Sequence, residues 1–199
     1  KGFSAVFAFE GWDAAGKGGA IRRLTAAMDP LSFAVYPYAA PNAVERMYHY
    51  LWRFWQNVPA PGEISIFDRT WYGRVMVERI EKLTPDVDWR RGYAEINEME
   101  KQWSEANMVL AKFWLQIDQE EQARRFKDRE ENPEKEWKIT EEDWRNRAKW
   151  SDYEAAVNEM IARTNTDYAP WIIVEANSKY YARLKVLETV IDLLEKKLK

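Results

Sequence analysis

Cysteine is absent from the 199 residues, and histidine occurs once, as His49. A chain without cysteine forms no disulfide, carries no thiol nucleophile and binds no metal through sulfur. One histidine is too few for a histidine-ligated zinc site, and it makes a Ser-His-Asp triad an unattractive hypothesis. His49 falls among aromatic residues of a predicted helix, where packing or solvation is the favoured role.

A large excess of one charge sign and long apolar runs are also missing. The net charge is −3, so we expect no nucleic-acid partner, and any polyanion must be held by local basic clusters. No apolar run has the length of a membrane span and no signal peptide is visible, so we expect a cytoplasmic protein without membrane contact. The length fits a single domain over residues 1–199.

Glycine occurs eight times, and half of these glycines lie in one short stretch, from Gly11 to Gly19. The stretch follows the apolar run 5–9, a predicted strand, and precedes 20–28, a predicted helix. A glycine-bounded loop between strand and helix, with Lys17 after its last bounding glycine, predicts a phosphate-binding loop. The alternative is a turn that only connects the two elements. The predicted phosphate ligands are Gly11, Ala14, Ala15, Gly16, Lys17, Gly18 and Gly19.

The loop departs from the common Gly-x-x-x-x-Gly-Lys-Ser/Thr pattern at one position. Gly18 stands where the metal-binding hydroxyl is expected. Another residue must then hold a magnesium ion, and Asp13, inside the loop, is the candidate.

A second acidic candidate follows the apolar run 63–67. Asp68 stands at the carboxyl end of this predicted strand, where a Walker B carboxylate reaches the metal of a bound nucleotide. Arg69 and Arg74 follow, and guanidinium groups bind phosphates with two hydrogen bonds. The alternative is a loop carboxylate that pairs with Arg69. Asp13, Lys17, Asp68, Arg69 and Arg74 are the predicted catalytic residues.

Three further apolar runs, at 33–38, 108–117 and 171–175, complete a set of five predicted strands that alternate with helices. Helices are expected at 43–57, 73–81, 92–107 and 178–198, the first of them capped by Asn42 with Glu45 three residues later. This alternation predicts an α/β fold with a three-layered, P-loop kinase-like architecture, a five-stranded and mostly parallel sheet, and a helical lid.

The predicted lid is the charged region 118–166. Within it, residues 120–149 hold ten acidic and nine basic side chains, which is also the composition of a plain solvated surface. In phosphoryl-transfer enzymes an excursion before the last strand is where a lid lies. Its predicted phosphate ligands are Arg124, Arg125, Arg129 and Lys138, and Arg125 and Arg129 share one helix face. A capping box at 140–143 is expected to start a further helix.

These motifs together resemble polyphosphate kinase family 2. Residues 9–21 are similar to its Walker A segment, residues 67–74 to its Walker B segment, and residues 121–138 to its lid. Trp12, the run 50–55, Gly73 and the run 77–81 are most similar to its polyphosphate:AMP phosphotransferase branch. Members of that branch often carry two related domains in tandem.

The resemblance implies a phosphotransferase that moves a phosphoryl group from inorganic polyphosphate to a purine nucleotide. AMP to ADP is the expected main reaction, with ADP to ATP as a second one. It implies Mg²⁺ as cofactor, with Mn²⁺ as a substitute, bound by Asp13 and Asp68. A homo-oligomer or a tandem second domain is the implied assembly. The alternatives are an ATP-dependent nucleoside monophosphate kinase of the thymidylate kinase type and a non-catalytic polyanion- or nucleotide-binding domain.

Overall fold

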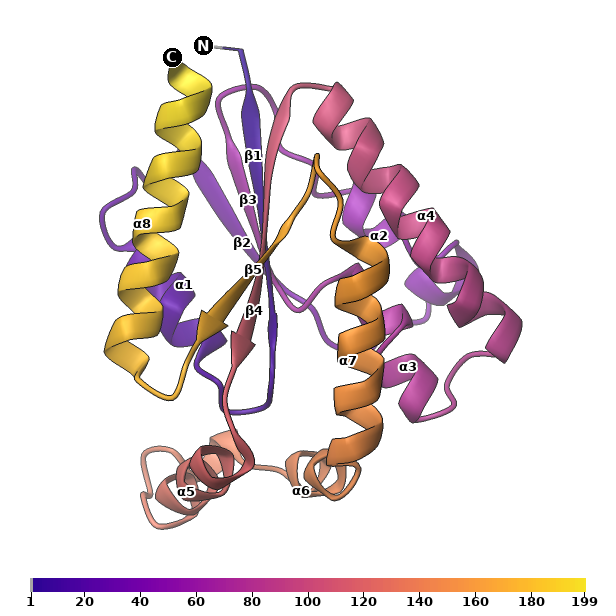
Figure 1. Cartoon of the computed structure of the whole chain (residues 1–199), viewed down its shortest axis with the longest axis vertical. Coiled ribbons are helices and arrows are strands. Elements are labelled where there is room, and N and C mark those ends of the chain that lie inside the picture. The colour runs from indigo at the N-terminus through magenta and orange to yellow at the C-terminus, as the bar shows by residue number, and fades with distance from the viewer. Residues whose placement is uncertain (1) are drawn as a thin grey trace.

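A computed structural model describes residues 2–199 as a five-stranded sheet between two layers of helices (Figure 1). The strands are β1 (Ser4–Gly11), β2 (Phe33–Pro37), β3 (Ile64–Asp68), β4 (Met108–Gln116) and β5 (Trp171–Glu175). Their order is β2-β3-β1-β4-β5, and every neighbouring pair is parallel. The predicted α/β class is confirmed, and the sheet is parallel throughout.

The central position of β1 determines where the site forms. Residues 4–10 are all buried, because helices cover both faces of the sheet and favour a continuous apolar run. The register pairs Phe9 with Asp68 of β3 and Gly11 with Leu115 of β4. The glycine-rich loop and Asp68 therefore leave the sheet at the same edge.

The helices divide between the two faces and this edge (Figure 1). Helices α1 and α8 pack together on one face, whereas α4 and α7 pack together on the other. Helices α5 and α6 lie beyond the carboxyl ends of the strands. The α-helices are α1 (Lys17–Thr25), α2 (Trp52–Trp55), α3 (Val77–Ile80), α4 (Asp86–Glu105), α5 (Gln119–Glu130), α6 (Glu141–Ala148), α7 (Trp150–Thr164) and α8 (Lys179–Leu198). The 3-10 helices are η1 (Glu45–Met47), η2 (Trp71–Arg74) and η3 (Glu136–Lys138).

The expected helix at 43–57 is wrong as one continuous element. Asn42 caps its start, accepting from the N–H groups of Val44 and Glu45 at 2.9 Å each, but the helix that follows is only the three-residue η1. The chain then turns extended at Tyr48 and resumes as the four-residue α2. Tyr50 beyond the break donates to the carbonyl of Gly92, so contact with α4 overrides the helical spacing. The expected helix at 73–81 is similarly divided, into η2 and α3.

The charged region 118–166 has two parts of different character. Helix α6 buries none of its residues and begins at the capping box of Thr140 and Asp143 as expected, whereas α5 buries Gln122, Arg125 and Phe126 on one side. Helix α7 instead buries one face in the hydrophobic core, including Tyr153, Val157 and Met160. The solvated character expected of the whole region holds only for α6 and for the exposed side of α5.

A buried ion pair joins α4 to β4 inside the core. Lys112 Nζ lies 2.7 Å from Glu100 Oε2, and both side chains are almost fully buried. Lys112 also donates to the Thr164 carbonyl, while Glu100 accepts from Trp71 Nε1 and the Tyr72 hydroxyl. Burial raises the pKa of Glu100 and lowers the pKa of Lys112, which are the directions that oppose ionisation. Each charge therefore depends on its partner.

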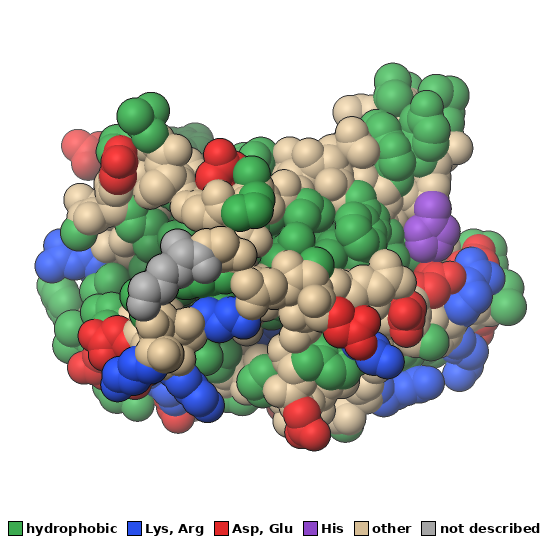
Figure 2. Space-filling view, turned by 90° about the horizontal axis from the view of Figure 1, so that it is seen from above, with side chains coloured by type: hydrophobic (Ala, Val, Ile, Leu, Met, Phe, Trp, Pro, Cys, Tyr) green, Lys and Arg blue, Asp and Glu red, His purple; other side chains and the backbone are tan. Residues whose placement is uncertain are grey.

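Among the described residues, the surface at the amino ends of the strands carries side chains of both charge signs. Figure 2 shows acidic and basic side chains interspersed there around exposed apolar ones. Among residues 2–199, no helix has the length and apolar composition needed to cross a membrane.

Replacing one member of the buried pair should be costly. Lys112→Met leaves the Glu100 carboxylate buried without its cation, so we expect a loss of about 3–5 kcal/mol in the free energy of unfolding. Urea denaturation measures it. Lys101→Met, at an exposed site where Lys101 pairs with Glu105 at 3.9 Å, is the control and should cost about 0.5 kcal/mol or less. Equal costs for the two variants would contradict a structural role for the pair.

Candidate phosphate-binding site

The loop between β1 and α1 has the backbone of an anion cradle. Gly16 caps α1 in the left-handed region with φ 105°, and Ala14 is also left-handed with φ 61°. The Ala15 N–H donates to the Trp12 carbonyl at 3.0 Å, which closes the loop. The N-terminus of the nine-residue α1 then faces the loop opening, where its N–H groups favour negative charge.

Gly11 permits the loop to begin where it does. Its φ is 148°, and a Cβ built there would lie 2.6 Å from the Leu115 carbonyl oxygen. The backbones of β1 and β4 thus approach closer than any side chain allows. Gly18 has more room, because a Cβ there would lie 4.0 Å from Asp68 Oδ2.

Lys17 and the buried Glu10 are charged side chains next to the loop backbone. Lys17 Nζ donates to the carbonyls of Gly11 at 2.7 Å and Trp12 at 3.2 Å. Burial raises the pKa of the Glu10 carboxyl, and the nearby Lys17 charge opposes this shift. Glu10 Oε1 accepts from both the N–H and the hydroxyl of Thr70, each at 2.7 Å. The carboxylate therefore links the end of β1 to the turn after β3.

That turn carries Asp68 and Arg69. Arg69 is left-handed with φ 65°, an uncommon conformation for a residue with a side chain, and its N–H donates to the Phe9 carbonyl. Arg69 Nη2 lies 4.0 Å from Asp13 Oδ1. Asp13, Lys17, Gly18, Asp68 and Arg69 thus meet at one edge of the sheet.

Arg74 lies in a separate polar cluster. Its Nη1 donates to the Thr84 hydroxyl, its Nε lies 3.2 Å from Glu78, and its guanidinium stacks 4.1 Å from the Tyr50 ring centre. A Cβ built at Gly92 of α4 would lie 2.8 Å from Arg74 Cγ, so the side chain lies beside α4. None of the partners described for Arg74 belongs to the loop.

Arg125 is buried, whereas a lid residue that binds phosphate was expected to be accessible. Its side chain is 3% exposed, and its five N–H groups all have acceptors within the protein. Those acceptors are the carbonyls of Ala14, Ala15, Ala176 and Asn177 and the carboxylate of Glu121. A phosphate could bind this guanidinium only by displacing one of them. Arg125 therefore holds the backbone of the loop through the carbonyls of Ala14 and Ala15.

The other predicted lid bases lie nearer the surface. Arg124 is 63% exposed and forms a bidentate pair with Glu121 at 2.7 Å. Arg129 donates to the Lys138 carbonyl, and the Lys138 ammonium lies 4.9 Å from the Trp137 ring centre. Arg125 and Arg129 belong to one helix as expected, yet only Arg129 contacts the exposed segment around η3, through Lys138.

The lid also contacts the loop directly. The rings of Trp12 and Trp150 stack with centres 3.7 Å apart and planes 8° from parallel. Asn146 of α6 donates to Asp13 Oδ2 at 3.0 Å. Sequence reasoning missed both contacts and the role of Glu10. Glu10 could have been found, because the rule that selects Asp68, an acid at the carboxyl end of an apolar strand, selects it too.

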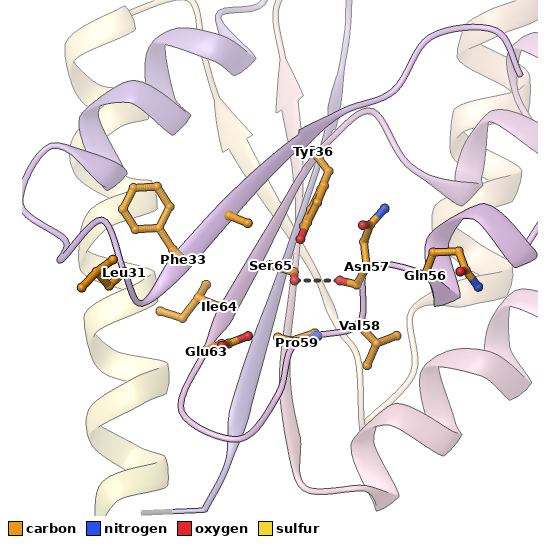
Figure 3. Close-up of a pocket in the computed structure, with 11 residues that line it drawn as sticks. Leu31, Phe33, Tyr36, Gln56, Asn57, Val58, Pro59, Glu63, Ile64 and Ser65 are labelled. Atoms are coloured by element: carbon orange, nitrogen blue, oxygen red, sulfur yellow. Dashed lines mark hydrogen bonds between the residues drawn. The ribbon is translucent and has the colours of Figure 1, made fainter. Parts of the chain in front are cut away.

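A shallow cavity of about 220 Å³ lies elsewhere, between the start of β2 and the segment before β3 (Figure 3). Its polar groups include Ser65, whose hydroxyl donates to the Asn57 carbonyl, and Glu63. The lining has no basic side chain, so it does not suit a phosphate ligand.

Two glycines of the loop should respond differently to substitution. Gly11→Ala places a Cβ against the Leu115 backbone at an unfavourable φ, so we expect a loss of about 3 kcal/mol or more in unfolding free energy. Gly18→Ser fits the space and should leave stability nearly unchanged. Thermal and urea unfolding of both variants measure the difference. Equal stabilities would show that β1 and β4 can separate at Gly11 without cost.

Acid should weaken the anchorage of Arg125. The hydrogen bonds from Arg124 have the largest effect on the pKa of Glu121; burial opposes them, the one hydrogen bond from Arg125 adds to them, and the pKa falls to about 2 from its usual 4.5. The folded state therefore binds this proton less tightly than the unfolded state, and the stabilisation is complete above pH 4.5. It is lost as the pH falls towards 2.

Glu121→Gln removes the titrating group. We expect the wild type to lose on the order of 2 kcal/mol more than this variant between pH 5 and pH 2. Urea unfolding across this range measures it, with Glu120→Gln on the exposed side of α5 as the charge-matched control. Parallel stability profiles for wild type and Glu121→Gln would contradict the assignment.

Comparison with known proteins agrees with this geometry. The sequence pattern of Polyphosphate kinase 2 (PPK2) matches residues 1–199. A polyphosphate:AMP phosphotransferase of Pseudomonas syringae pv. tomato is 56% identical over 98% of this chain, which spans 39% of that relative's length. An AMP/ADP-polyphosphate phosphotransferase of Meiothermus ruber is 36% identical, over 92% of this chain and 68% of the relative.

A solved structure gives the same result. The crystal structure of a polyphosphate kinase 2 from Arthrobacter aurescens TC1 has a TM-score of 0.95 and 34% identity, over 98% of this chain and 69% of that one. The match to the family pattern over the whole chain, the relatives and the shared fold lead to one conclusion. The chain belongs to the polyphosphate kinase 2 family.

Proposed function

We propose that this chain transfers a phosphoryl group from inorganic polyphosphate to a nucleotide, with AMP to ADP as the main reaction and ADP to ATP as a second one. The names of the relatives from P. syringae and M. ruber support the donor and the acceptors. The observation that carries the proposal is the meeting of the loop, Asp68 and Arg69 at one edge of the sheet.

The chemistry requires positioning more than proton transfer. The attacking group is a phosphate oxygen of the acceptor, which is already anionic at neutral pH. Alignment of the two substrates and neutralisation of their charge then supply most of the rate. Lys17 and the N–H groups of the loop bind the phosphates near the transferred group, while Arg69 offsets charge that spreads over it. Arg74 is proposed to contribute to the same neutralisation.

Asp13 and Asp68 would hold Mg²⁺, with Mn²⁺ as a substitute. Asp68 Oδ2 lies 4.0 Å from the Cβ position of residue 18, so it reaches the region that the missing hydroxyl would serve. In the described chain, no cluster of three or more acidic or histidine side chains could hold a metal alone. Mg²⁺ commonly binds one or two carboxylates together with substrate phosphates, so two aspartates fit. The bound ion would neutralise charge on those phosphates.

The exposed bases of the lid are proposed to bind the polyphosphate chain. Arg124, Arg129 and Lys138 can turn towards a polyanion because their present contacts are exposed. Arg125 has a different proposed role, which is to hold Ala14 and Ala15 in place. A homo-oligomer, a tandem second domain and a cytoplasmic location stay predictions.

A donor-by-acceptor matrix tests the function. The chain is incubated with Mg²⁺, with either polyphosphate or ATP as donor, and with AMP, ADP or TMP as acceptor, and products are separated by nucleotide chromatography. We expect polyphosphate and AMP to give ADP without ATP. Asp68→Asn should lower that rate by roughly 10² to 10⁴, because a carboxylate that positions the metal is lost.

Other results would redirect the proposal. ATP-dependent phosphorylation of TMP without any polyphosphate reaction would favour a thymidylate kinase-type enzyme. Binding of polyphosphate without turnover would favour a non-catalytic domain. Wild-type turnover by Asp68→Asn would remove Asp68 from the proposed metal site.

A further inference from the structure

Asp13 is held by the lid through one of its two carboxylate oxygens. Asn146 Nδ2 donates to Oδ2 at 3.0 Å, although the two residues are 133 positions apart in the chain. The other oxygen, Oδ1, lies 4.0 Å from Nη2 of Arg69, the residue that follows β3. The two oxygens of one carboxylate therefore face different groups.

The direction of the Asn146 amide is fixed by Tyr153 of α7. The Tyr153 hydroxyl donates to Asn146 Oδ1 at 3.2 Å. If the amide rotated by half a turn, its oxygen would face the Asp13 carboxylate and its NH₂ would face the hydroxyl. Only one orientation makes both hydrogen bonds while the hydroxyl keeps its donor role.

The backbone around Asn146 is anchored on both sides. Glu81, just after α3, lies 3.5 Å from Arg145 and 2.8 Å from Lys149. One residue later, Trp150 stacks on Trp12 of the loop. These contacts hold the corner between α6 and α7 over Asp13, so the amide reaches the carboxylate from a fixed support.

We propose that Asn146, oriented by Tyr153, is a positioning residue that holds Asp13 with Oδ1 presented to the cation and phosphates at the loop. The inference rests on the proposed function only for the metal role of Asp13. A mere latch between lid and loop would alter stability or opening of the lid without changing the metal requirement. Groups that orient a metal ligand change metal affinity or activity by about 10- to 100-fold when they are removed.

Two variants and two controls test the proposal. Asn146→Leu keeps the approximate shape without hydrogen bonds, and Tyr153→Phe removes only the orienting hydroxyl. Asn158→Leu and Tyr180→Phe make the same changes at exposed positions of α7 and α8. The Mg²⁺ concentration for half-maximal rate, kcat and the KM for AMP are measured at saturating polyphosphate.

We expect Asn146→Leu to raise the Mg²⁺ requirement about tenfold and to lower kcat. Tyr153→Phe should shift both in the same direction by about threefold, because the amide remains but loses its orientation. The KM for AMP should stay unchanged, and the controls should match the wild type. Wild-type Mg²⁺ dependence and kcat in both variants would overturn the proposal.

A second measurement does not depend on turnover. Hydrogen exchange without metal follows the backbone amides of Trp12 and Ala15, which donate to the carbonyls of Leu115 in β4 and of Trp12. Asn146→Leu should speed their exchange about tenfold, with a smaller effect of Tyr153→Phe. Unchanged exchange would show that the hydrogen bond from Asn146 to Asp13 does not hold the loop, and it would overturn the proposal even if the wild type failed to use polyphosphate. If the wild type transferred no phosphoryl group but the variants exchanged faster, the proposed function would be rejected, while the hold of Asn146 on the loop would stand.

Discussion

One guanidinium holds the parts of the site together. Arg125 reaches the phosphate loop through Ala14 and Ala15, and the junction of β5 and α8 through Ala176 and Asn177. These segments are far apart in the chain. Because all five N–H groups are used, the guanidinium is satisfied in a buried place where an unpaired charge would be very costly. The hydrogen bonds of Arg125 to Ala14 and Ala15 lie beside the left-handed residues Ala14 and Gly16, so they help to hold this backbone conformation.

Two buried carboxylates apply the same principle in different places. Glu100 is balanced by Lys112 and stabilises the core, whereas Glu10 lies near Lys17 and binds Thr70 beside the loop. In both, burial is the largest effect and raises the pKa, while a nearby cation and hydrogen-bond donors act in the opposite direction. Glu10 differs because its bonds hold the left-handed Arg69 turn. The strain of that turn is thus offset at the position where Arg69 leaves the edge of the sheet beside the loop.

The parts of the site that are local in the chain were predictable. The glycine-rich loop, Lys17 and Asp68 follow from strand, loop and helix signals within a few residues, and the parallel sheet brings them to one edge. The buried position of Arg125 could not be predicted, because its acceptors lie up to 111 positions away and helical spacing cannot distinguish a buried guanidinium from an exposed one. Asn146 was missed for the same reason. The helix expected at 43–57 failed because Tyr50 packs on α4, a tertiary contact that local propensity does not contain.

The stacked rings of Trp12 and Trp150 give the loop an optical signature of its own. Among residues 2–199 this is the pair of tryptophans that stacks in parallel, while the other close tryptophan pairs meet edge to face. Two indoles at 3.7 Å couple their electronic transitions, so their near-ultraviolet circular dichroism depends on their mutual angle. Because one indole belongs to the loop and the other to the lid, the protein carries a chromophore pair whose signal follows the distance between the two, without any added label.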